Sequence, residues 1–480
     1  MRNSEWRKQL RESMPAKART EIQRVSMPET SVEERVKSQR IEVNGGLSEE
    51  QARREASRCM DCVVPTCMEG CPVGIDIPSF IKNIERGEYS QASAVLKMTS
   101  ALPAVCGRVC PQEKQCEARC FYVEKLKKQP VAIGYLERFA ADYDMETGSS
   151  ELAEKAASNG VKIAVVGSGP SGLSFAKDMA QYGYDVTVFE ALHEIGGVLK
   201  YGIPEFRLPN RVVDVEIENL KRLGVKFVTN FIVGKTQTVD ELKALGFKGF
   251  YIASGAGLPR FMNIPGENYN GILSSNEYLT RVNLMGADSD EYDTPVYRGR
   301  NVVVVGGGNT AMDSVRTAKR LGAERAIILY RRSEAEMPAR VEDVKHAKEE
   351  GCELMTLSNP MAYSADETGR VKQVKVQRMQ LGEPDESGRC AATPIEGSEY
   401  VLDADVVVVA VGVSPNPIIP ETVADLNVSK WGTVLVDNTT MQSNIAELYA
   451  GGDIVRGGAT VILAMGDGRK AARNMHENLK

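Results

Sequence analysis

A strand, a glycine-rich turn and a helix follow one another twice in this chain, and this repeat limits the fold more than any other feature. The first copy reads VKIAVV, GSG and PSGLSFAKDMAQYG from residue 161, followed by YDVTVFE. The second reads RNVVVV, GGG and NTAMDSVRTAKRLG from residue 300, followed by RAIILYRR. Buried strands that alternate with helices predict parallel sheets covered on both faces. We therefore expect an α/β fold with two doubly wound dinucleotide-binding domains, the second inserted in the first.

The first glycine turn has the spacing of a dinucleotide-binding loop. Gly167, Gly169 and Gly172 form G-x-G-x-x-G after a strand. The three glycines serve the tight turn, the close approach of a pyrophosphate and the packing of helix on strand, in that order. Pro170 and Ser171 open the next helix, whose N–H groups and positive dipole end favour phosphate. The motif alone is weak, and a bare packing turn could also produce it.

Residues beyond the first turn favour FAD. Glu190 ends the following strand, where a carboxylate accepts hydrogen bonds from ribose hydroxyls and repels a 2′-phosphate, so FAD or NAD suits the site. Gly197 in HEIGG offers a second close backbone approach. In LYAGGDIV, Gly452 and Asp453 follow a strand, and this carboxylate is placed to bond a ribityl or ribose hydroxyl. The alternative for Asp453 is an ordinary turn or cap residue.

The second turn is a G-x-G-x-x-A variant formed by Gly306, Gly308 and Ala311. Asn309 and Thr310 open its helix, so the same phosphate-binding geometry is predicted.

The strand after the second turn ends in arginines. Arg331 and Arg332 stand where the first copy has Glu190, and guanidinium groups pair with a 2′-phosphate, so NADP(H) is preferred. The alternative is a pair of solvated loop charges. Arg340 is either a further phosphate contact or a surface residue.

Eight of the ten cysteines lie in the first 120 residues. The N-terminus, MRNSEWRKQLRESMPAK, has no apolar signal region, so a disulfide framework is not expected and the cysteines are more suited to metal in a cytoplasmic protein. A net charge of −6 gives no indication of a nucleic-acid or membrane surface. With only three histidines, chemistry that needs several imidazoles is not expected.

The cysteine spacing is C-x₂-C-x₄-C-x₃-C-P, followed by C-x₃-C-P-x₄-C-x₃-C. It resembles the ferredoxin run in which the fourth cysteine, before proline, ligates a second cluster. This favours two [4Fe–4S] clusters over zinc, and over a non-catalytic zinc scaffold. Cys59, Cys62 and Cys67 would share one cluster, while Cys71 would join the other. Spacing leaves three ligands for the first and five for the second, the remaining four being Cys106, Cys110, Cys116 and Cys120.

The chain resembles the small (β) subunit of NADPH-dependent glutamate synthase over nearly its whole length. The same module forms the N-terminal part of dihydropyrimidine dehydrogenase and the large subunit of the bifurcating NADH-dependent ferredoxin:NADP oxidoreductase. The motifs that carry the resemblance are CPVGIDIP, LPAVCGRVCPQEKQCEARC, PVAIGYLERF, VVGSGPSGL, EIGGVLKYGIPEFRLP, VVGGGNTAMD, YRRSEAEMPAR and YAGGDIVRGG.

The resemblance implies one ligand that is not cysteine. It places Glu137, in IGYLERF, with Cys59, Cys62 and Cys67 on the first cluster. It then gives the second cluster the four cysteines Cys71, Cys110, Cys116 and Cys120. Cys106 is left as a neighbour of the second cluster rather than a ligand.

The resemblance also implies domains and a function. Residues 1–150 would form a helical domain that binds the two clusters, residues 151–294 and 412–480 would bind FAD, and residues 295–411 would bind NADPH. Electrons would pass from NADPH through FAD and the clusters to a partner, without a catalytic side chain. That partner would be the large glutamate synthase subunit, which makes glutamate from glutamine and 2-oxoglutarate. The alternative is the bifurcating oxidoreductase, with a small flavin/[2Fe–2S] partner.

Overall fold

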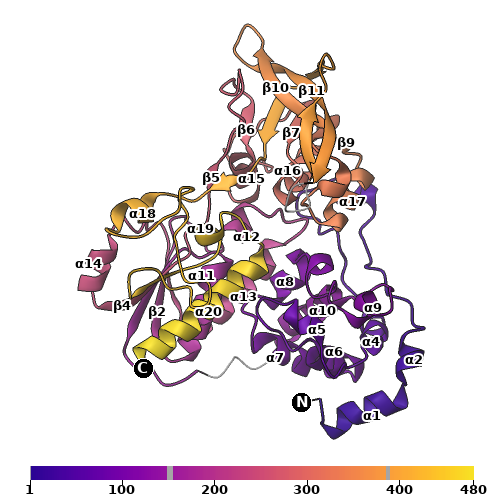
Figure 1. The fold of residues 1–480 in the computed structure, drawn as a ribbon, viewed down its shortest axis with the longest axis vertical. Coiled ribbons are helices and arrows are strands. Elements are labelled where there is room, and N and C mark those ends of the chain that lie inside the picture. The colour runs from indigo at the N-terminus through magenta and orange to yellow at the C-terminus, as the bar shows by residue number, and fades with distance from the viewer. Residues whose placement is uncertain (1, 149–154, 385–389) are drawn as a thin grey trace.

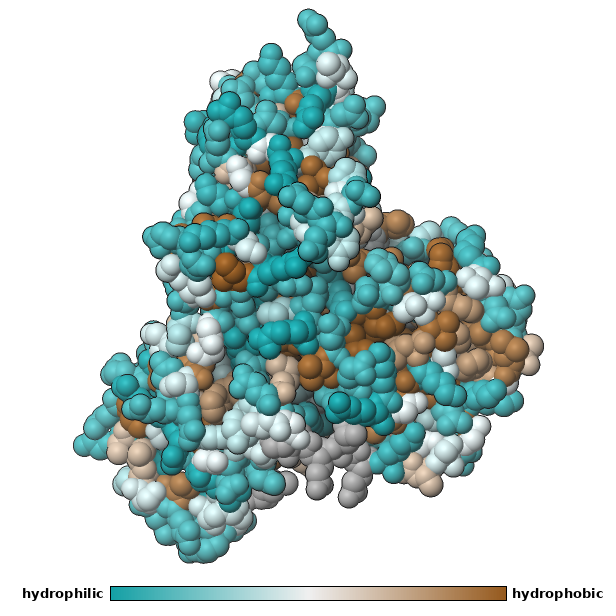
Figure 2. All heavy atoms as spheres, turned by 180° about the vertical axis from the view of Figure 1, so that it is seen from behind, coloured by the Kyte–Doolittle hydropathy of each residue, from teal (hydrophilic) through white to brown (hydrophobic). Residues whose placement is uncertain are grey.

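Three lobes make up the computed structural model, which describes residues 2–148, 155–384 and 390–480 (Figure 1). An all-helical lobe precedes two lobes that each contain a parallel sheet, as expected from the sequence. The expected boundary after residue 150 lies outside the described residues. Hydrophilic side chains cover most of the upper lobe, while hydrophobic ones gather on the right-hand lobe in Figure 2. Among the described residues, no helix has the length and apolar character needed to span a membrane.

Short helices build the N-terminal lobe. Ser48 and Gln51 form a capping box at the start of one of them. The helices in chain order are α1 (Glu5–Ser13), α2 (Ala16–Arg19), α3 (Val32–Arg35), α4 (Glu49–Ser57), α5 (Thr66–Glu69), α6 (Ile77–Glu85), α7 (Tyr89–Lys97), α8 (Pro103–Val109), the 3₁₀ turn η1 (Gln112–Lys114), α9 (Phe121–Glu124) and α10 (Ile133–Thr147).

A five-stranded parallel sheet in the order β16-β4-β1-β2-β3 forms the first nucleotide lobe. Helices α11 and α20 pack against each other in this lobe. Its elements are β1 (Lys162–Val166), α11 (Pro170–Gln181), β2 (Asp185–Phe189), α12 (Val198–Tyr201), α13 (Asn210–Arg222), β3 (Lys226–Val228), α14 (Val239–Ala244), β4 (Phe247–Ile252), α18 (Ile418–Thr422), β16 (Leu448–Ala450), α19 (Asp453–Arg456) and α20 (Val461–Leu479). One apolar core joins this lobe to the helical lobe, running from Phe80 to Met475.

A second parallel sheet, in the order β6-β14-β7-β8-β9, forms the other nucleotide lobe, and an antiparallel sheet of β10 to β13 stands beside it. The expected boundary between residues 294 and 295 falls too late, because β6 already pairs with β14 of this sheet. The elements are β6 (Ile272–Ser274), α15 (Ser275–Asn283), β7 (Asn301–Val305), α16 (Asn309–Arg320), β8 (Arg325–Leu329), the 3₁₀ turn η2 (Glu334–Glu336), α17 (Val341–Glu349), β9 (Glu353–Met355), β10 (Ser358–Ala365), β11 (Val371–Pro384), β12 (Cys390–Pro394), β13 (Tyr400–Asp403) and β14 (Val406–Val409).

Two kinds of connection join the lobes. β5 (Leu258–Pro259) and β15 (Val413–Ser414) pair antiparallel where the chain leaves the first nucleotide lobe and returns to it. Residues 28–44, here called the strap, link the helical lobe to the second nucleotide lobe. In the strap, Arg35 reaches Glu349 Oε2 at 2.8 Å, and Gln39 Nε2 donates to the carbonyl of Thr317 at 3.0 Å.

Candidate functional site

The first glycine turn has the backbone that a dinucleotide needs. Gly167 has a φ of +102°, and a Cβ there would overlap the carbonyl of Ala253. A Cβ on Gly172 would likewise overlap the carbonyl of Gly167, so the helix sits directly on the turn. A Cβ on Gly169 would meet no atom within 4 Å, which leaves open space in front of the N-terminus of α11. Pro170 and Ser171 form the first turn of that helix.

Two more glycines bring their loops against this turn. Gly197 has a φ of +54°, and its Cβ would lie 3.0 Å from the Cα of Gly169. Gly452 has a φ of +76°, and its Cβ would lie 3.0 Å from the Cβ of Ser171. The structure therefore brings together backbone segments from three distant parts of the sequence, as a cradle for an extended cofactor requires.

The predicted ribose-binding carboxylates have defined surroundings. Glu190 is buried, and its Oε2 accepts hydrogen bonds from the backbone N (2.9 Å) and Oγ (2.6 Å) of Ser168, in the glycine turn. Asp453 begins α19 directly after the Gly452 turn. Burial raises the pKa of Asp453, and the negative charge of Asp467 acts in the same direction. Asp467 itself accepts from the backbone N of Gly452 at 3.1 Å, so it fixes the loop that carries Asp453.

The second glycine turn repeats this geometry. Gly306 has a φ of +141°, and a Cβ there would overlap the carbonyl of Ala410. Gly308 precedes the first residue of α16, and Ala311 is fully buried under the turn. Thr310 is exposed at the helix N-terminus, where a phosphate would bind.

The predicted arginines differ in burial and in hydrogen-bond partners. Arg331 is exposed just beyond the end of β8, while Arg332 is half-buried and its Nε donates to the carbonyl of Cys390 at 2.9 Å. Arg340 is not the surface residue that one alternative expects. It is buried between lobes, and its Nη1 donates to the carbonyl of Arg108 at 2.8 Å. Its backbone N also donates to Asn309 Oδ1 at 2.9 Å, at the start of α16.

The N-terminal thiols form two groups. The first, called site A, lines one pocket beside Phe121 and Val131 and consists of Cys59, Cys62, Cys67 and Cys120. Burial, together with the neighbouring thiols of this group, raises the pKa of Cys62 to about 11 and raises that of Cys67 further.

The second group, called site B, consists of Cys71, Cys110, Cys116 and Glu137. Burial raises the pKa of Cys71 to about 11, and Glu137 and Cys110 add to this effect. Burial also raises the pKa of Cys116, to which Glu137, Cys110 and Cys71 contribute. Burial raises the pKa of Glu137 to about 8, and the nearby Glu216 acts in the same direction.

In the structure, Glu137 and Cys120 have exchanged places relative to the division that the resemblance implies. The resemblance places Glu137 beside Cys59, Cys62 and Cys67, and Cys120 in the other group. That division is wrong in the structure, because Cys120 lines the site A pocket and Glu137 lies among the site B thiols. The reason is that α10 packs on α8, which carries Cys106 and leads directly into Cys110.

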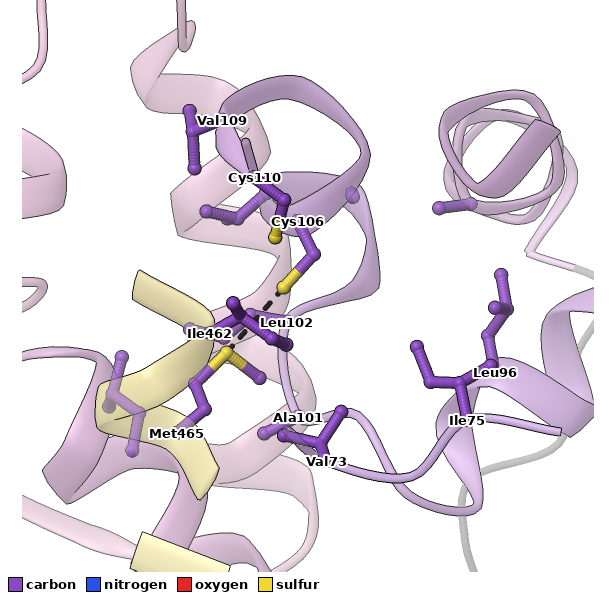
Figure 3. Packing of buried hydrophobic residues seen from close by; sticks show 14 of the residues in the cluster. Val73, Ile75, Leu96, Ala101, Leu102, Cys106, Val109, Cys110, Ile462 and Met465 are labelled. Atoms are coloured by element: carbon purple, nitrogen blue, oxygen red, sulfur yellow. Dashed lines mark hydrogen bonds between the residues drawn. The ribbon is translucent and has the colours of Figure 1, made fainter. Parts of the chain in front are cut away.

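Cys106 lies between site B and the first nucleotide lobe. Its thiol is fully buried, 3.6 Å from the Sδ of Met465 in α20 (Figure 3). A hydrogen bond with Cys110 and burial raise its pKa. Helix α20 also approaches the residue that follows Cys71 of site B, since a Cβ on Gly466 would lie 3.0 Å from the carbonyl of Pro72. The neighbours Cys106 and Pro72 therefore connect site B to the first nucleotide lobe.

Both thiol sites fit iron–sulfur clusters by their donor chemistry. The thiols of each site are grouped and free of disulfides, and as thiolates they are the ligands that iron–sulfur clusters take. In site B, Oε1 of Glu137 is buried without a hydrogen-bond partner among the described residues. A carboxylate oxygen without a partner, surrounded by thiols, is the arrangement that a metal would complete.

Basic residues around site A were not foreseen from the sequence. Asp61, between Cys59 and Cys62, is fully buried with a φ of +52° and is held by Arg7 and Arg11 of α1. Lys82 of α6 donates to the carbonyl of Cys59. In the sequence, Asp61 is simply one of the two residues inside C-x-x-C. The cysteine spacing does not indicate that it is buried and paired with arginines.

Comparisons with known proteins agree with this geometry. Residues 35–149 match the family described as dihydropyrimidine dehydrogenase domain II with a 4Fe-4S cluster, and residues 161–468 match the pyridine nucleotide-disulphide oxidoreductase family. Among solved structures, Mycobacterium tuberculosis FprA in complex with NADPH aligns with a TM-score of 0.57 and 20% identity, over 67% of this chain and 85% of FprA. A 2-naphthoyl-CoA reductase aligns with a TM-score of 0.51 and 20% identity, over 84% of this chain and 49% of that one. At these identities the two structures show the fold alone.

The fold and the site thus define an oxidoreductase with an FAD- and NADP-binding unit and a 4Fe–4S domain. The glutamate synthase [NADPH] small chain of Azospirillum brasilense is 36% identical over 445 residues, which cover 92% of this chain and 91% of that protein. The corresponding Escherichia coli K12 protein is 35% identical over 460 residues, covering 94% and 96%. The NADP(+)-dependent formate dehydrogenase subunit beta of Moorella thermoacetica is 37% identical over 441 residues, covering 87% and 60%. The chain belongs to the glutamate synthase [NADPH] small-chain family.

Proposed function

We propose that the chain is the NADPH-oxidising electron-input subunit of a glutamate synthase. It takes electrons from NADPH and delivers them, through FAD and two [4Fe–4S] clusters, to a large subunit that makes glutamate from glutamine and 2-oxoglutarate. The small chains of two glutamate synthases, matched over nearly their full length, support this reading. The observation that carries it is the contact of site B with α20, because it puts a thiol site against the lobe that has the FAD-type turn.

The chain supplies binding and positioning rather than acid–base chemistry. When bound, FAD supplies the exchange between a two-electron donor and one-electron carriers. Its pyrophosphate would be held by the N-terminus of α11, and its ribose by Glu190. The second turn would hold the NADPH pyrophosphate at Gly308, Asn309 and Thr310. Arg331 and Arg332 would hold its 2′-phosphate.

The two thiol sites differ in what lies next to them. Site B contacts the first nucleotide lobe through Cys106 and Pro72. Site A faces outward, since Val63 and Val64 in its loop are 76% and 70% exposed. We propose that each site holds one cluster, with site B receiving electrons from the flavin side and site A passing them to the partner.

Nucleotide preference provides a test of the donor site. Replacing Arg331 and Arg332 with serine should raise the KM for NADPH by roughly 10- to 100-fold, because each charge-assisted hydrogen bond contributes about 1.5 to 3 kcal/mol. The KM for NADH should stay within about two-fold, and the matched control is Arg300→Ser, an exposed arginine paired with Glu324 in the same lobe. An equal loss with both nucleotides would contradict the assignment.

Reconstitution with a partner tests the final acceptor. The chain alone should oxidise NADPH with ferricyanide but form no glutamate, and adding a large glutamate synthase subunit should couple NADPH oxidation to glutamate formation. Glutamate synthesis by the chain alone would contradict the proposal. Ferredoxin reduction with a small flavin/[2Fe–2S] partner instead would show the bifurcating function.

A further inference from the structure

A group of metal-ligating side chains lies far from the thiol sites, where the strap meets the second nucleotide lobe. Glu342 and His346 are four residues apart on α17, so both point from the same face of the helix. Glu29 comes from the strap, beside its backbone bridge with Asn44. Two elements from distant parts of the sequence therefore supply three potential ligands.

The three side chains converge. One ligand atom each from Glu29, Glu342 and His346 lie within 4.8 Å of one another. His346 is only 2% exposed, and its Nε2 has no hydrogen-bond partner among the described residues, although it is 3.3 Å from Glu29 Oε1. Glu342 and His346 also line a small pocket at this junction, together with five arginines, among them Arg340. A buried imidazole nitrogen is thus aimed, without a hydrogen bond, at two carboxylates.

Arginines hold the far oxygen of each carboxylate. Arg340 Nη2 donates to Glu342 Oε2 at 3.0 Å, and Arg35 Nη1 is 3.4 Å from Glu29 Oε2. The Oε1 atoms therefore point toward His346 and Asn44, Glu342 Oε1 accepting from Asn44 Nδ2 at a long 3.3 Å. Outer contacts that orient one oxygen and leave the other for a cation are typical of metal sites with monodentate carboxylates.

The side-chain ammonium of Lys345 would compete with a metal ion for Glu29. Lys345 Nζ lies 2.8 Å from Glu29 Oε1. This lysine side chain is about half exposed and has Glu349 Oε1 at 3.5 Å as a second partner. It can therefore leave Glu29 without losing every ionic contact. Arg35 similarly retains Glu349 and Glu350 as partners.

We propose that Glu29, Glu342 and His346 form a binding site for a divalent metal ion of the zinc class. One imidazole nitrogen and two carboxylate oxygens match the ligands of Zn²⁺, with water in the fourth position. The mixed donor set disfavours Mg²⁺, which prefers oxygen ligands and keeps its own water. The bound ion would join the strap to α17 and so fix the second nucleotide lobe against the N-terminal segment.

The test is a Zn²⁺ titration of the holoprotein followed by dialysis and metal analysis. The wild type should hold one equivalent of zinc that Glu29→Gln and His346→Gln do not hold. The matched control, Glu33→Gln, changes an exposed carboxylate of α3 in the same strap and should bind zinc as the wild type does. Added Zn²⁺ should also raise the unfolding temperature of the wild type and of Glu33→Gln, but not that of the two ligand variants.

Lys345→Gln provides a readout that a loss of folding cannot imitate. Removing the competing ammonium should tighten Zn²⁺ binding by roughly ten-fold. The proposal is overturned if the wild type holds no more zinc than Glu29→Gln, if Mg²⁺ binds as tightly as Zn²⁺, or if Lys345→Gln leaves the zinc affinity unchanged.

Discussion

Sites A and B use nearly the same ligands but differ in the charged and titratable groups beside them. Near site A, Lys82 and Arg19 approach the carbonyl of Cys59, and the Lys82 charge opposes the rise that burial causes in the pKa of Cys59. Near site B, Glu137 and Glu216 are buried carboxyls whose pKa values are raised to about 8 and about 7, mainly by burial. Positive charge close to a cluster favours its more negative, reduced state.

This contrast bears on the proposed direction of electron transfer, from site B to site A. Site B touches the first nucleotide lobe, while the loop of site A is exposed to solvent. A site of lower potential on the flavin side and one of higher potential at the surface would make transfer toward the partner favourable.

The largest effect is expected from removing a ligand of site A. Cys67→Ser should lose half of the iron and slow electron delivery to the partner by roughly 100-fold or more, because even outer-contact changes at metal sites cost 10- to 100-fold. Oxidation of NADPH by ferricyanide, which can take electrons at the flavin, should persist. Iron analysis and the two rates measure this.

Cys106→Ser is the matched control for that variant. Cys106 is as buried as any proposed ligand but belongs to neither set of four. The iron content of the Cys106→Ser variant should therefore equal that of the wild type. If Cys106→Ser lost as much iron as Cys67→Ser, the division into two sets of four would be wrong.

A change at Glu137 should affect only site B. Glu137→Ala should remove one electron-spin resonance signal and lower electron delivery by roughly 10- to 100-fold. Glu137→Cys should retain iron and make site B an all-thiolate site like site A, with an altered signal. Glu146→Ala, an exposed carboxylate on the same helix, should change neither. Loss of the site A signal in Glu137→Ala would contradict the grouping.

The buried Glu216 should make stability depend on pH. Its folded pKa of about 7 is above the ordinary value of 4.5, so between these values the folded state keeps a proton that the unfolded state releases. Stability should therefore fall as pH rises from 4.5 to 7. Glu216→Gln, which can still accept from the backbone N of Ala104, should match the wild type near pH 5 and exceed it by about 2 kcal/mol near pH 8.

Thermal unfolding across this pH range measures the effect. Glu218→Gln, an exposed carboxylate two positions along α13, should keep the pH profile of the wild type. Identical profiles for Glu216→Gln and the wild type would show that Glu216 ionises normally.

The smallest effect concerns the potential of site A. Lys82→Met should lower its midpoint potential by about 50 mV, because one buried positive charge near the cluster contributes on the order of 1 kcal/mol. The potential of site B should stay unchanged, as should both potentials in the exposed control Lys125→Met. A redox titration followed by electron-spin resonance distinguishes the sites, and equal shifts in both would contradict local control by Lys82.

The nucleotide lobes were predictable because their chemistry is local. Gly167 and Gly306 need positive φ within a few residues of a strand, and both patterns are visible in the sequence. The pairing of thiols was not predictable, because Cys120 is 53 positions from Cys67 and reaches site A only through packing of helices. Arg340 shows the same limit: its motif suggested phosphate, while the fold buries it against Arg108.

The domain boundary failed for a similar reason. β6 is a three-residue strand whose membership in the second sheet depends on pairing with β14, more than a hundred residues later. Short strands have little periodicity, so their partners appear only in the folded chain.

The contact between Cys106 and Met465 spans 359 positions of sequence. On a ribosome, every ligand of site B emerges long before the helix that covers it. If cluster insertion began on the nascent chain, site B would meet solvent and oxygen until α20 was made and docked. We therefore expect site B to be more exposed to oxygen while the chain is being made than in the folded protein.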